Sequence, residues 1–342
     1  MKGKDGHRVA SWAAILAGIA IVLLLQAAPG RAQEKVTFAL DFFAYGKHAG
    51  FYAALDRGFY REQGLDVTIL RGSGSGDTIK RIGAGSENFG FADTASLIPA
   101  RARGVQVKEI AMIHDRNLHT LFFLKGSGMT RPKDLEGRRI GGTEGDATRV
   151  IFPAFAAVNG IDEKKVEWVT MTAEARLPSL LAGRVDAGVW FFTEAPTVLA
   201  RARQVGKEVG WFLYPDWGVD VYSNGLIATD RTIRERPDLT RRFVHATLKG
   251  VAWGVENPEA VVDLFVRHQP TISRDLAMAH WQIAVDHLMT ATAVKMGIGY
   301  MTREKMERTR DLITETMKLP VKVPVEDLYT NEFLPKLFPR RK

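Results

Sequence analysis

The sequence predicts an α/β fold made of two lobes, and three features of its pattern support this expectation. Short β-rich runs alternate with helical stretches from residue 35 to residue 114, which is typical of strands joined by helices in a mostly parallel sheet. The pattern breaks at 126–133 (GSGMTRPK) and then restarts. A strand-like run at 224–230 is followed by long helical stretches with little strand. We therefore expect the second lobe to be inserted into the first.

The elements of the first lobe follow from hydrophobic periodicity and from glycine stops. The expected strands are 35–40, 65–70, 88–93, 107–114 and 119–125, with the last two as neighbours. The expected helices are 48–64, 78–82 and 94–104, and after the inserted lobe 230–256, 258–267, 273–292 and 302–317. The segment RGSGSGD at 71–77 is expected as a flexible turn that leads into a helix.

The second lobe shows the same alternation. Its expected strands are 138–143, 165–171, 185–191 and 207–214, and its expected helices are 146–160, 173–183 and 194–206. Two hinge-crossing strands are expected near 124–126 and near 224–226. The predicted boundaries are therefore 33–124 and 226–342 for the first lobe and 125–225 for the second.

The first 32 residues have the pattern of a secretory signal peptide. Lys2, Lys4 and Arg8 precede an uncharged run at 12–25, and small residues precede the cleavage site expected after Ala32. An uncleaved anchor at 9–28 is the alternative, because that stretch is about long enough to span a membrane. The sequence contains no cysteine, which excludes a lipid-modified N-terminal cysteine, cysteine-bound metal and thiol catalysis. We expect a periplasmic protein that is not a lipoprotein.

The composition indicates an ordinary solvated surface. The net charge is +8, but acidic and basic residues alternate along the chain and form no charged tail. This pattern gives no support to a nucleic-acid partner. Two α/β lobes joined by a pair of strands suit a clamshell that closes on a ligand by hinge motion. In such folds, strand C-termini and helix N-termini supply polar groups to the cleft.

The segment LDFFAYGKHAGFYAALDRGFYREQGLDVTI at 40–69 resembles the opening of a family of periplasmic binding proteins, the thiamine-pyrimidine-synthase/alkanesulfonate-binding family. Further resembling stretches are 89–111, 132–142, 180–189, 224–250 and 256–263, so that the resemblance covers nearly the whole predicted mature chain. It implies a two-lobe, clamshell (type II) periplasmic binding protein. Such a protein is a monomer that serves an ABC importer, with permease and ATPase subunits as partners. The branch that binds thiamine pyrimidine precursors is the most similar.

The resemblance also implies which residues of the first lobe meet the ligand. In pyrimidine-binding relatives an acid accepts hydrogen bonds from ring amines and an aromatic side chain stacks on the ring, and these roles fall on Asp41 and Phe42. Phe42 stands where relatives often have Trp. Tyr45 and His48 are further candidates. Phe43 and Phe51 are candidates equally for the core, and Asp41 has the alternative role of a cap.

Two other segments of the first lobe are candidates from their residue types. Ser73, Gly74 and Ser75 can offer N–H and hydroxyl groups to a polar or anionic ligand group, although the segment lacks the Lys-Ser/Thr ending of a phosphate loop. The alternative is a connector without ligand contact. Asp93 and Ser96 follow the third strand, where Asp93 is equally suited to cap a helix.

The second lobe is expected to supply the opposite wall. Relatives have an aromatic residue and a Glu after the corresponding strand, and the resemblance assigns these roles to Trp190 and Glu194. The alternatives are a core Trp190 and a helix-terminal charge at Glu194. Thr143 is a candidate ligand contact, and Asp146 is the expected N-cap. Trp217 and Tyr222 lie near the return crossing and complete the set of candidates.

These residues predict a site with aromatic faces and acids on both lobes. Such a site favours a flat nitrogen heterocycle with donor groups, similar to a thiamine pyrimidine precursor. An alkanesulfonate, nitrate or aromatic carboxylate remains the alternative, because Arg149 and the Gly–Ser turn could meet an anion. An enzyme is not expected: the synthases that resemble this chain use a cysteine cluster, and the histidines here show no paired metal spacing. No cofactor is expected. A sensory adaptor remains open, because the choice of transport rests on family analogy.

Overall fold

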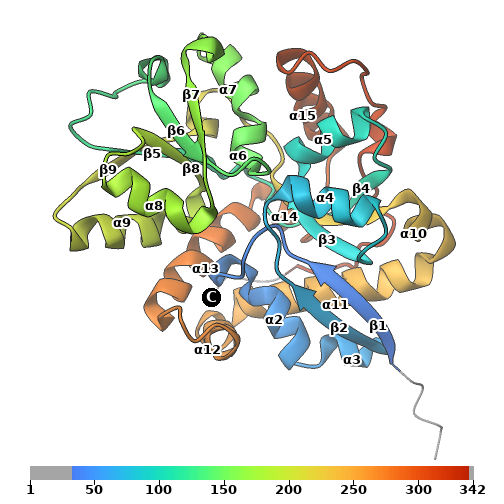
Figure 1. The fold of residues 1–342 in the computed structure, drawn as a ribbon. Coiled ribbons are helices and arrows are strands. Elements are labelled where there is room, and N and C mark those ends of the chain that lie inside the picture. Colours follow the sequence, from blue (N-terminus) through green and yellow to red (C-terminus); the bar gives the residue numbers. More distant parts are fainter. Residues whose placement is uncertain (1–32, 339–342) are drawn as a thin grey trace, which may run out of the picture. The chain divides into compact units, whose positions relative to one another are not determined.

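The computed structural model describes residues 33–338, and the predicted signal peptide lies outside the described residues. Two five-stranded sheets organise the compact unit that begins at Lys35 (Figure 1). The first sheet has the order β2-β1-β3-β10-β4 and the second has the order β7-β6-β8-β5-β9. The α/β prediction is therefore confirmed.

The first sheet contains β1 (Glu34–Ala39), β2 (Leu65–Leu70), β3 (Phe89–Asp93), β4 (Val107–Met112) and β10 (Asn224–Thr229). β1 alternates along its length, with Val36 and Phe38 buried, as expected for a strand with two different faces. β3 is buried at every position, as expected for a central strand covered on both faces. β1 and β3 run parallel, with Phe38 opposite Phe89.

The second sheet contains β5 (His119–Leu124), β6 (Arg139–Gly142), β7 (Glu167–Thr170), β8 (Ala187–Phe191) and β9 (Val209–Leu213). β6 runs parallel to β7 and β8, whereas β5 runs antiparallel to β8 and β9. In the first sheet, β10 likewise runs antiparallel to β3 and β4. Both sheets are thus mixed, and the expectation of mostly parallel sheets was wrong for the strands that follow a crossing.

The placement of β5 also corrects the expected crossing. The sequence predicts that 119–125 pairs with the preceding strand, but β5 pairs with β8 and β9 of the other sheet. The chain therefore leaves the first sheet at 113–118, before 124–126, and returns between β9 and β10 at 214–223. The sequence of two consecutive apolar strands does not show whether they pair with each other, because the backbone of a strand can form its hydrogen bonds with any neighbouring strand.

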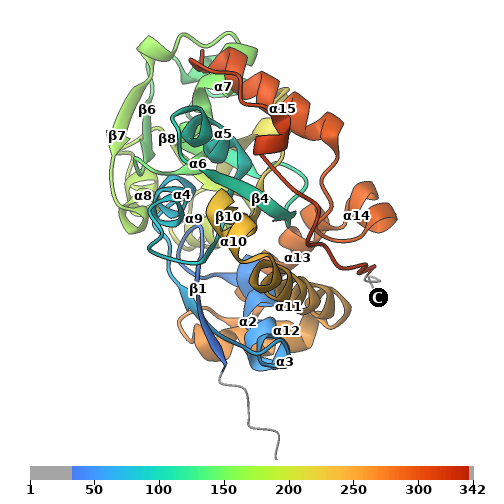
Figure 2. The same ribbon diagram turned by 90° about the vertical axis from the view of Figure 1, so that its right-hand side faces the viewer.

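The helices pack around these sheets (Figures 1 and 2). They are α2 (Ala49–Asp56), α3 (Phe59–Glu62), α4 (Ser75–Gly83), α5 (Thr94–Ala102), α6 (Ala147–Val150), α7 (Phe152–Val158), α8 (Ala173–Leu181), α9 (Ala195–Gln204), α10 (Asp230–Glu235), α11 (Pro237–Glu256), α12 (Pro258–His268), α13 (Arg274–Leu288), α14 (Ala291–Met296) and α15 (Arg303–Thr316). α2 packs on α11 and α12, and α4 packs on β3 and α5. The predicted helix at 48–64 is broken at Gly58, whose positive φ of 74° a glycine adopts without strain.

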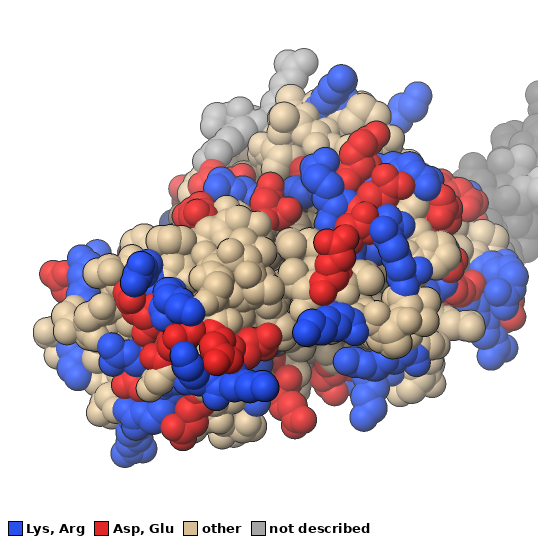
Figure 3. Space-filling view, turned by 90° about the horizontal axis from the view of Figure 1, so that it is seen from above, with Lys and Arg blue, Asp and Glu red and all other residues tan. Residues whose placement is uncertain are grey.

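A cluster of aromatic rings forms the core between β1, β3 and α11. The rings of Phe89 and Phe243 stack with centroids 4.0 Å apart, and Phe38 meets Phe51 edge to face at 5.2 Å. Phe51, left open between core and site, is 1% exposed and belongs to this core, whereas Phe43 is only partly buried. The surface seen in Figure 3 carries Lys and Arg side chains interspersed with Asp and Glu, which agrees with the alternating charges of the sequence.

Candidate ligand-binding site

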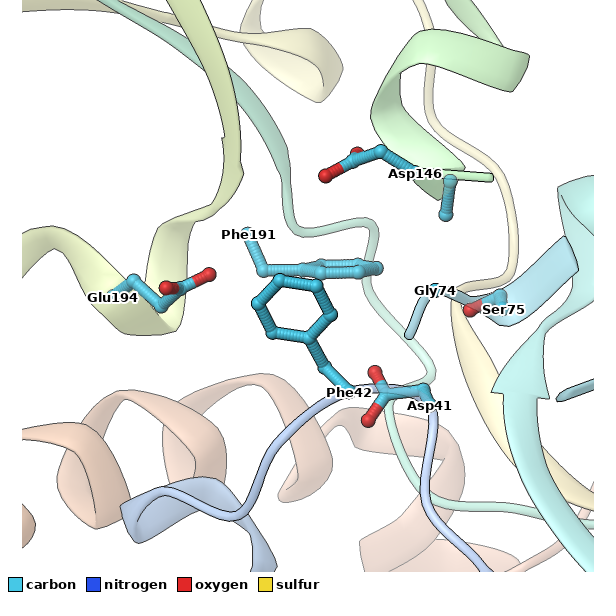
Figure 4. Close-up of a pocket in the computed structure, with 8 residues that line it drawn as sticks. Asp41, Phe42, Gly74, Ser75, Asp146, Phe191 and Glu194 are labelled. Carbon is cyan, nitrogen blue, oxygen red and sulfur yellow. The ribbon is translucent and has the colours of Figure 1, made fainter. Parts of the chain in front are cut away.

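A small pocket lies where segments of both sheets meet. Its lining residues are Asp41, Phe42, Gly74, Ser75, Asp146, Ala147, Phe191 and Glu194 (Figure 4). Asp41 and Phe42 follow β1, and Phe191 ends β8. Gly74 and Asp146 are the N-caps of α4 and α6. The pocket thus lies at strand ends and helix starts, where α/β folds expose polar groups.

Asp41 lies in the first wall, the side of the pocket formed by segments that follow strands of the first sheet. Its carboxylate is 1% exposed and accepts from Lys47 Nζ at 2.5 Å and from Asn224 Nδ2 at 2.9 Å, and it lies 2.8 Å from His48 Nε2. Burial acts to raise the pKa of Asp41, but the ammonium of Lys47 and the bond with His48 outweigh burial and hold the pKa well below its usual value. The carboxylate is therefore charged, and three neighbours already occupy most of its capacity to accept hydrogen bonds.

Two phenyl rings line the centre of the pocket, one from each wall. Phe42 is 8% exposed and Phe191 is 8% exposed, so that their faces toward the pocket are nearly closed off from solvent. Figure 4 shows both rings between Glu194 on one side and the Gly74–Ser75 turn on the other. The ammonium of Lys47 lies 4.4 Å from the centroid of Phe191. Aromatic faces of this kind can stack on a planar ligand.

The second wall carries an arginine between two acids. Arg176 of α8 is 1% exposed and donates from Nη1 to Asp146 Oδ2 at 2.7 Å, while its Nη2 lies 4.0 Å from Glu194 Oε1. Asp146 also caps α6 through Thr148 N, as the sequence predicted. The guanidinium lies 4.5 Å from the Trp190 ring and 5.8 Å from the Phe42 ring, so it reaches from the second wall toward the first.

Glu194 differs from the other two acids of the pocket. Burial raises the pKa of its carboxyl to about 7, although Arg176 and Lys47 act in the opposite direction. Its nearest cation is 4.0 Å away, so its oxygens are less committed than those of Asp41. Glu194 therefore changes between a neutral acid and a carboxylate near neutral pH, and it has capacity to bind a hydrogen-bond donor.

The glycine-rich turn is tightly packed, which corrects the expectation of a flexible segment. Gly72 N donates to Phe42 O at 3.1 Å, and Gly74 N donates to Asp41 O at 2.8 Å. A Cβ at Gly72 would lie 2.0 Å from Leu40 O, so the turn approaches β1 as only glycine allows. Gly74 and Ser75 line the pocket, whereas Ser73 is exposed and does not belong to the lining residues.

Asp93 and Ser96 lie behind the pocket. Asp93 caps α5 by accepting from Ser96 N at 3.2 Å, and its N–H donates to Ser75 Oγ at 3.1 Å. Its Oδ2 lies 3.1 Å from His119 Nε2 of the other sheet, an ion-pair distance without hydrogen-bond geometry. Ser96 Oγ has no hydrogen-bond partner among the described residues. The capping alternative for Asp93 is thus confirmed, and its ligand role has no support from the pocket lining.

The remaining candidates do not line the pocket. Trp190 is 3% exposed and packs at 5.7 Å against Phe122, because alternate residues of β8 face opposite sides and Phe191 takes the pocket side.

Trp217 packs edge to face on Phe212, and the hydroxyl of Tyr222 accepts from Thr302 N. Thr143 is half-buried beside the turn before α6. Arg149 lies over Trp168 and bonds Thr170.

Tyr45 and His48 support the site from outside the lining. Tyr45 is 3% exposed, and its hydroxyl lies 3.1 Å from Thr193 Oγ1 of the opposite wall. Its N–H donates to His48 Nδ1 at 3.2 Å, so His48 joins Tyr45 to Asp41. Burial lowers the pKa of His48, which keeps the imidazole neutral. Both residues therefore hold Asp41 and the two walls in place.

Sequence reasoning missed four important members of the site: Lys47, Arg176, Phe191 and Asn224. The pairing of Lys47 with Asp41 had a signal, because a lysine inside an apolar stretch needs a counter-charge when it is buried. Arg176 and Asn224 are distant in sequence from their partners and left no local signal. Strand alternation shows that only one of Trp190 and Phe191 faces the cleft. It does not show which of the two does, so the sequence alone could not identify Phe191 as the pocket residue.

Two other classes of site find no support in the part of the chain that the structure describes. Within 33–338, no group of three or more His, Asp or Glu side chains is arranged to hold a metal ion. The same search range contains no helix long and apolar enough to cross a membrane.

The two mixed sheets, with a pocket at the ends of their strands, define the fold class of the periplasmic binding proteins. The alkanesulfonate-binding protein SsuA from Xanthomonas axonopodis pv. citri, solved with MOPS bound, has this fold. It matches this chain with a TM-score of 0.65 and 13% identity over 89% of this chain and 99% of its own.

Sequence comparison places the chain within this class. The family model described as "NMT1/THI5 like" matches residues 46–261, well over half of the chain, and the protein belongs to that family. The riboflavin-binding protein RibY of Chloroflexus aurantiacus is 25% identical over 88% of this chain and 86% of its own length. The formylaminopyrimidine-binding protein of Halalkalibacterium halodurans is 26% identical, covering 71% of this chain and 73% of its own. Other relatives, from Saccharomyces cerevisiae, are named 4-amino-5-hydroxymethyl-2-methylpyrimidine phosphate synthases.

Proposed function

We propose that the protein captures a small aromatic nitrogen heterocycle, similar to a thiamine pyrimidine precursor, and delivers it to an ABC importer. The observation that carries this proposal is the pocket lining, in which the rings of Phe42 and Phe191 and the acids Asp41, Asp146 and Glu194 surround one small space. The rings can stack on a flat ligand. The acids can accept hydrogen bonds from ring amines, which are strong when the acceptor is charged.

The charges favour a donor ligand over an anion. Both buried cations of the site are already paired, Lys47 with Asp41 and Arg176 with Asp146. An anionic ligand would have to compete with these carboxylates, and burying it beside three acids carries a large desolvation cost. A sulfonate, nitrate or aromatic carboxylate ligand is the second candidate, because the Nε of Arg176 is buried and has no hydrogen-bond partner among residues 33–338.

The names of two relatives support a heterocyclic ligand, since one is a formylaminopyrimidine-binding protein and another a riboflavin-binding protein. The fold of solved import-system components supports export and a transporter partner, in line with the predicted signal peptide, permease and ATPase. We propose a monomeric periplasmic binding protein and no catalytic role. The absence of cysteine separates this chain from the cysteine-dependent chemistry that the resemblance implies for the synthases.

Thermal-shift screening tests the proposal. A ligand that binds the native form raises the melting temperature. The panel contains 4-amino-5-hydroxymethyl-2-methylpyrimidine, a formylaminopyrimidine, thiamine, riboflavin, alkanesulfonates, nitrate and aromatic acids. We expect the aminopyrimidines to give the largest increase. An increase with sulfonates or nitrate alone would keep the binding-protein class and overturn the ligand proposed here.

Substitution of Phe191 separates the observed pocket from the residues that the sequence suggested. Phe191→Ala removes one of the two stacking faces and should weaken binding of an aminopyrimidine at least tenfold, as measured by calorimetric titration. Trp217→Phe, which changes a candidate outside the pocket lining, should bind with wild-type affinity. Equal losses in both variants would mean that the ligand lies elsewhere.

A further inference from the structure

One outer edge of the second sheet is an apolar strand that is open on its far side. Within residues 33–338, β9 pairs with β5 and with no other strand (Figure 1). Its sequence, VGWFL at 209–213, has no charged residue and no proline, which are the usual devices against pairing at a sheet edge. By contrast, β2 and β7 carry the exposed acids Asp66 and Glu167, and residues 328–330 form two backbone bonds with Glu109 of β4. Among the edges, β9 is therefore the one best suited to accept a further strand.

The hydrogen-bond pattern shows which backbone groups of β9 face outward. Lys125 N donates to Glu208 O at 2.9 Å, which makes these two residues a hydrogen-bonded pair. Such pairs alternate with non-bonded pairs along an antiparallel ladder. Val209 and Trp211, one and three positions after Glu208, therefore stand at non-bonded positions, and their N–H and C=O groups point away from β5. In the described part of the chain these groups have no hydrogen-bond partner, so a docked strand finds two donors and two acceptors.

A groove of about 350 Å³ lies beside these groups, between β9 and α9. Val209 and Trp211 point to the same face of the sheet, because they are two residues apart, and they line the groove together with Leu199 and Ala202 of α9. The ring of Trp211 lies 5.7 Å from the ring of Phe192 but remains 41% exposed. The groove thus offers an apolar floor and an aromatic ring to the side chains of a docked strand.

The rim of the groove is cationic. Lys125, Arg203 and Lys207 line it, against the single acid Glu208. Glu208 already pairs with Lys125 at 2.9 Å, and Lys207 Nζ donates to Leu181 O at 2.5 Å. The exposed guanidinium of Arg203 forms no ion pair or hydrogen bond with any residue in 33–338. A carboxylate placed in the groove would therefore pair with an arginine that has no partner within the protein itself.

We propose that β9 and this groove bind an extended acidic segment of a partner protein, which adds to the five-stranded second sheet as a further edge strand. The backbone of the segment bonds to Val209 and Trp211, an apolar side chain covers the Trp211 ring, and an acidic side chain pairs with Arg203. A second copy of this chain fits less well, because a symmetric interface brings a second set of the same cations to it. The residues of the groove are distinct from those that line the ligand pocket.

Two synthetic peptides test the charge of the partner. The probe is a capped heptapeptide of alternating glutamate and valine, and its control has lysine in place of glutamate. In calorimetric titrations the protein should bind the acidic peptide at least tenfold more tightly than the control. Arg203→Glu should lower the affinity for the acidic peptide at least tenfold, because repulsion replaces attraction. Arg201→Glu makes the same charge change on the same helix, outside the groove, and should bind as wild type. Thermal melts check that each variant is folded.

Amide hydrogen exchange locates the docked strand. With the acidic peptide bound, the amides of Val209 and Trp211 should exchange at least tenfold more slowly, because they gain partners, whereas Gly210 and Phe212, which already bond to β5, should change little. Absence of binding, equal affinity for the two peptides, or wild-type affinity in Arg203→Glu would overturn the proposal. Binding that leaves the Val209 and Trp211 amides unprotected would also overturn it. A concentration-dependent dimer that protects these amides without peptide would assign the edge to a second copy instead.

Discussion

Replacing Glu194 with glutamine is expected to stabilise the ligand-free protein and to weaken ligand binding at the same time. Burial raises the pKa of Glu194 from 4.5 to about 7 in the folded protein. Folding therefore loses stability as the pH rises from 4.5 to 7, and above pH 7 the charged side chain costs about 3 kcal/mol. Glutamine carries no such charge. In urea unfolding, Glu194→Gln should be more stable than wild type by up to about 3 kcal/mol at pH 8, and the gain should nearly vanish at pH 4.

The effect on binding has the opposite sign. A ring amine that donates to the Glu194 carboxylate forms a charge-assisted hydrogen bond, which is worth about 1.5–3 kcal/mol and corresponds to roughly 10- to 100-fold in affinity. Wild-type affinity for a ligand that does not itself titrate should fall by up to about tenfold per pH unit below pH 7, because the carboxyl must first lose its proton, until it reaches the affinity of the neutral form. Glu194→Gln should bind more weakly and show a flat pH profile. A wild-type profile that is flat between pH 5 and 8 would contradict this role for Glu194.

The second large effect is expected at Asp41. Asp41→Asn leaves the ammonium of Lys47, 3% exposed, without its counter-charge, and loss of one partner of a buried ion pair costs about 3–5 kcal/mol. Urea unfolding at pH 7 should show a loss of this size. The variant is thus expected to be much less stable as well as weak in binding, so that binding measurements on it must be made well below its melting temperature.

A double substitution separates the two roles of Asp41. Asp41→Asn with Lys47→Met removes both charges and should recover most of the lost stability, because an apolar side chain of similar volume replaces the buried ammonium. Binding should not recover, since the pocket still lacks the carboxylate. If the single variant loses less than about 1 kcal/mol, the ion pair does not stabilise the fold as described here.

The sequence was informative where the relevant signal is local. Periodicity and glycine stops located most strands and helices, and β1, β3 and β8 lie where the pattern predicted them. The partner of a strand is not a local property, and this is why β5 was assigned to the wrong sheet. Gly58 lies inside the helix predicted at 48–64, and only the structure shows that the helix breaks there.

The residues of the site also divide into those with a local sequence signal and those that depend on long-range packing. Asp41, Phe42, Gly74, Ser75 and Glu194 follow strands or open helices, and all five line the pocket. Arg176 lies in the middle of α8 and becomes part of the site only because that helix packs beside Trp190. Lys47 lies in a segment rich in aromatic residues, and the structure shows that it forms an ion pair with Asp41. Long-range charge pairing, which decides what the pocket can bind, requires the three-dimensional structure.

The most direct test of the proposed function is calorimetric titration of the protein with 4-amino-5-hydroxymethyl-2-methylpyrimidine at pH 8, with Phe191→Ala measured in parallel. The account predicts binding of one ligand per protein with a dissociation constant of about 1 μM or lower, and at least a tenfold loss in Phe191→Ala. No binding by wild type, or equal affinity in both proteins, would contradict it.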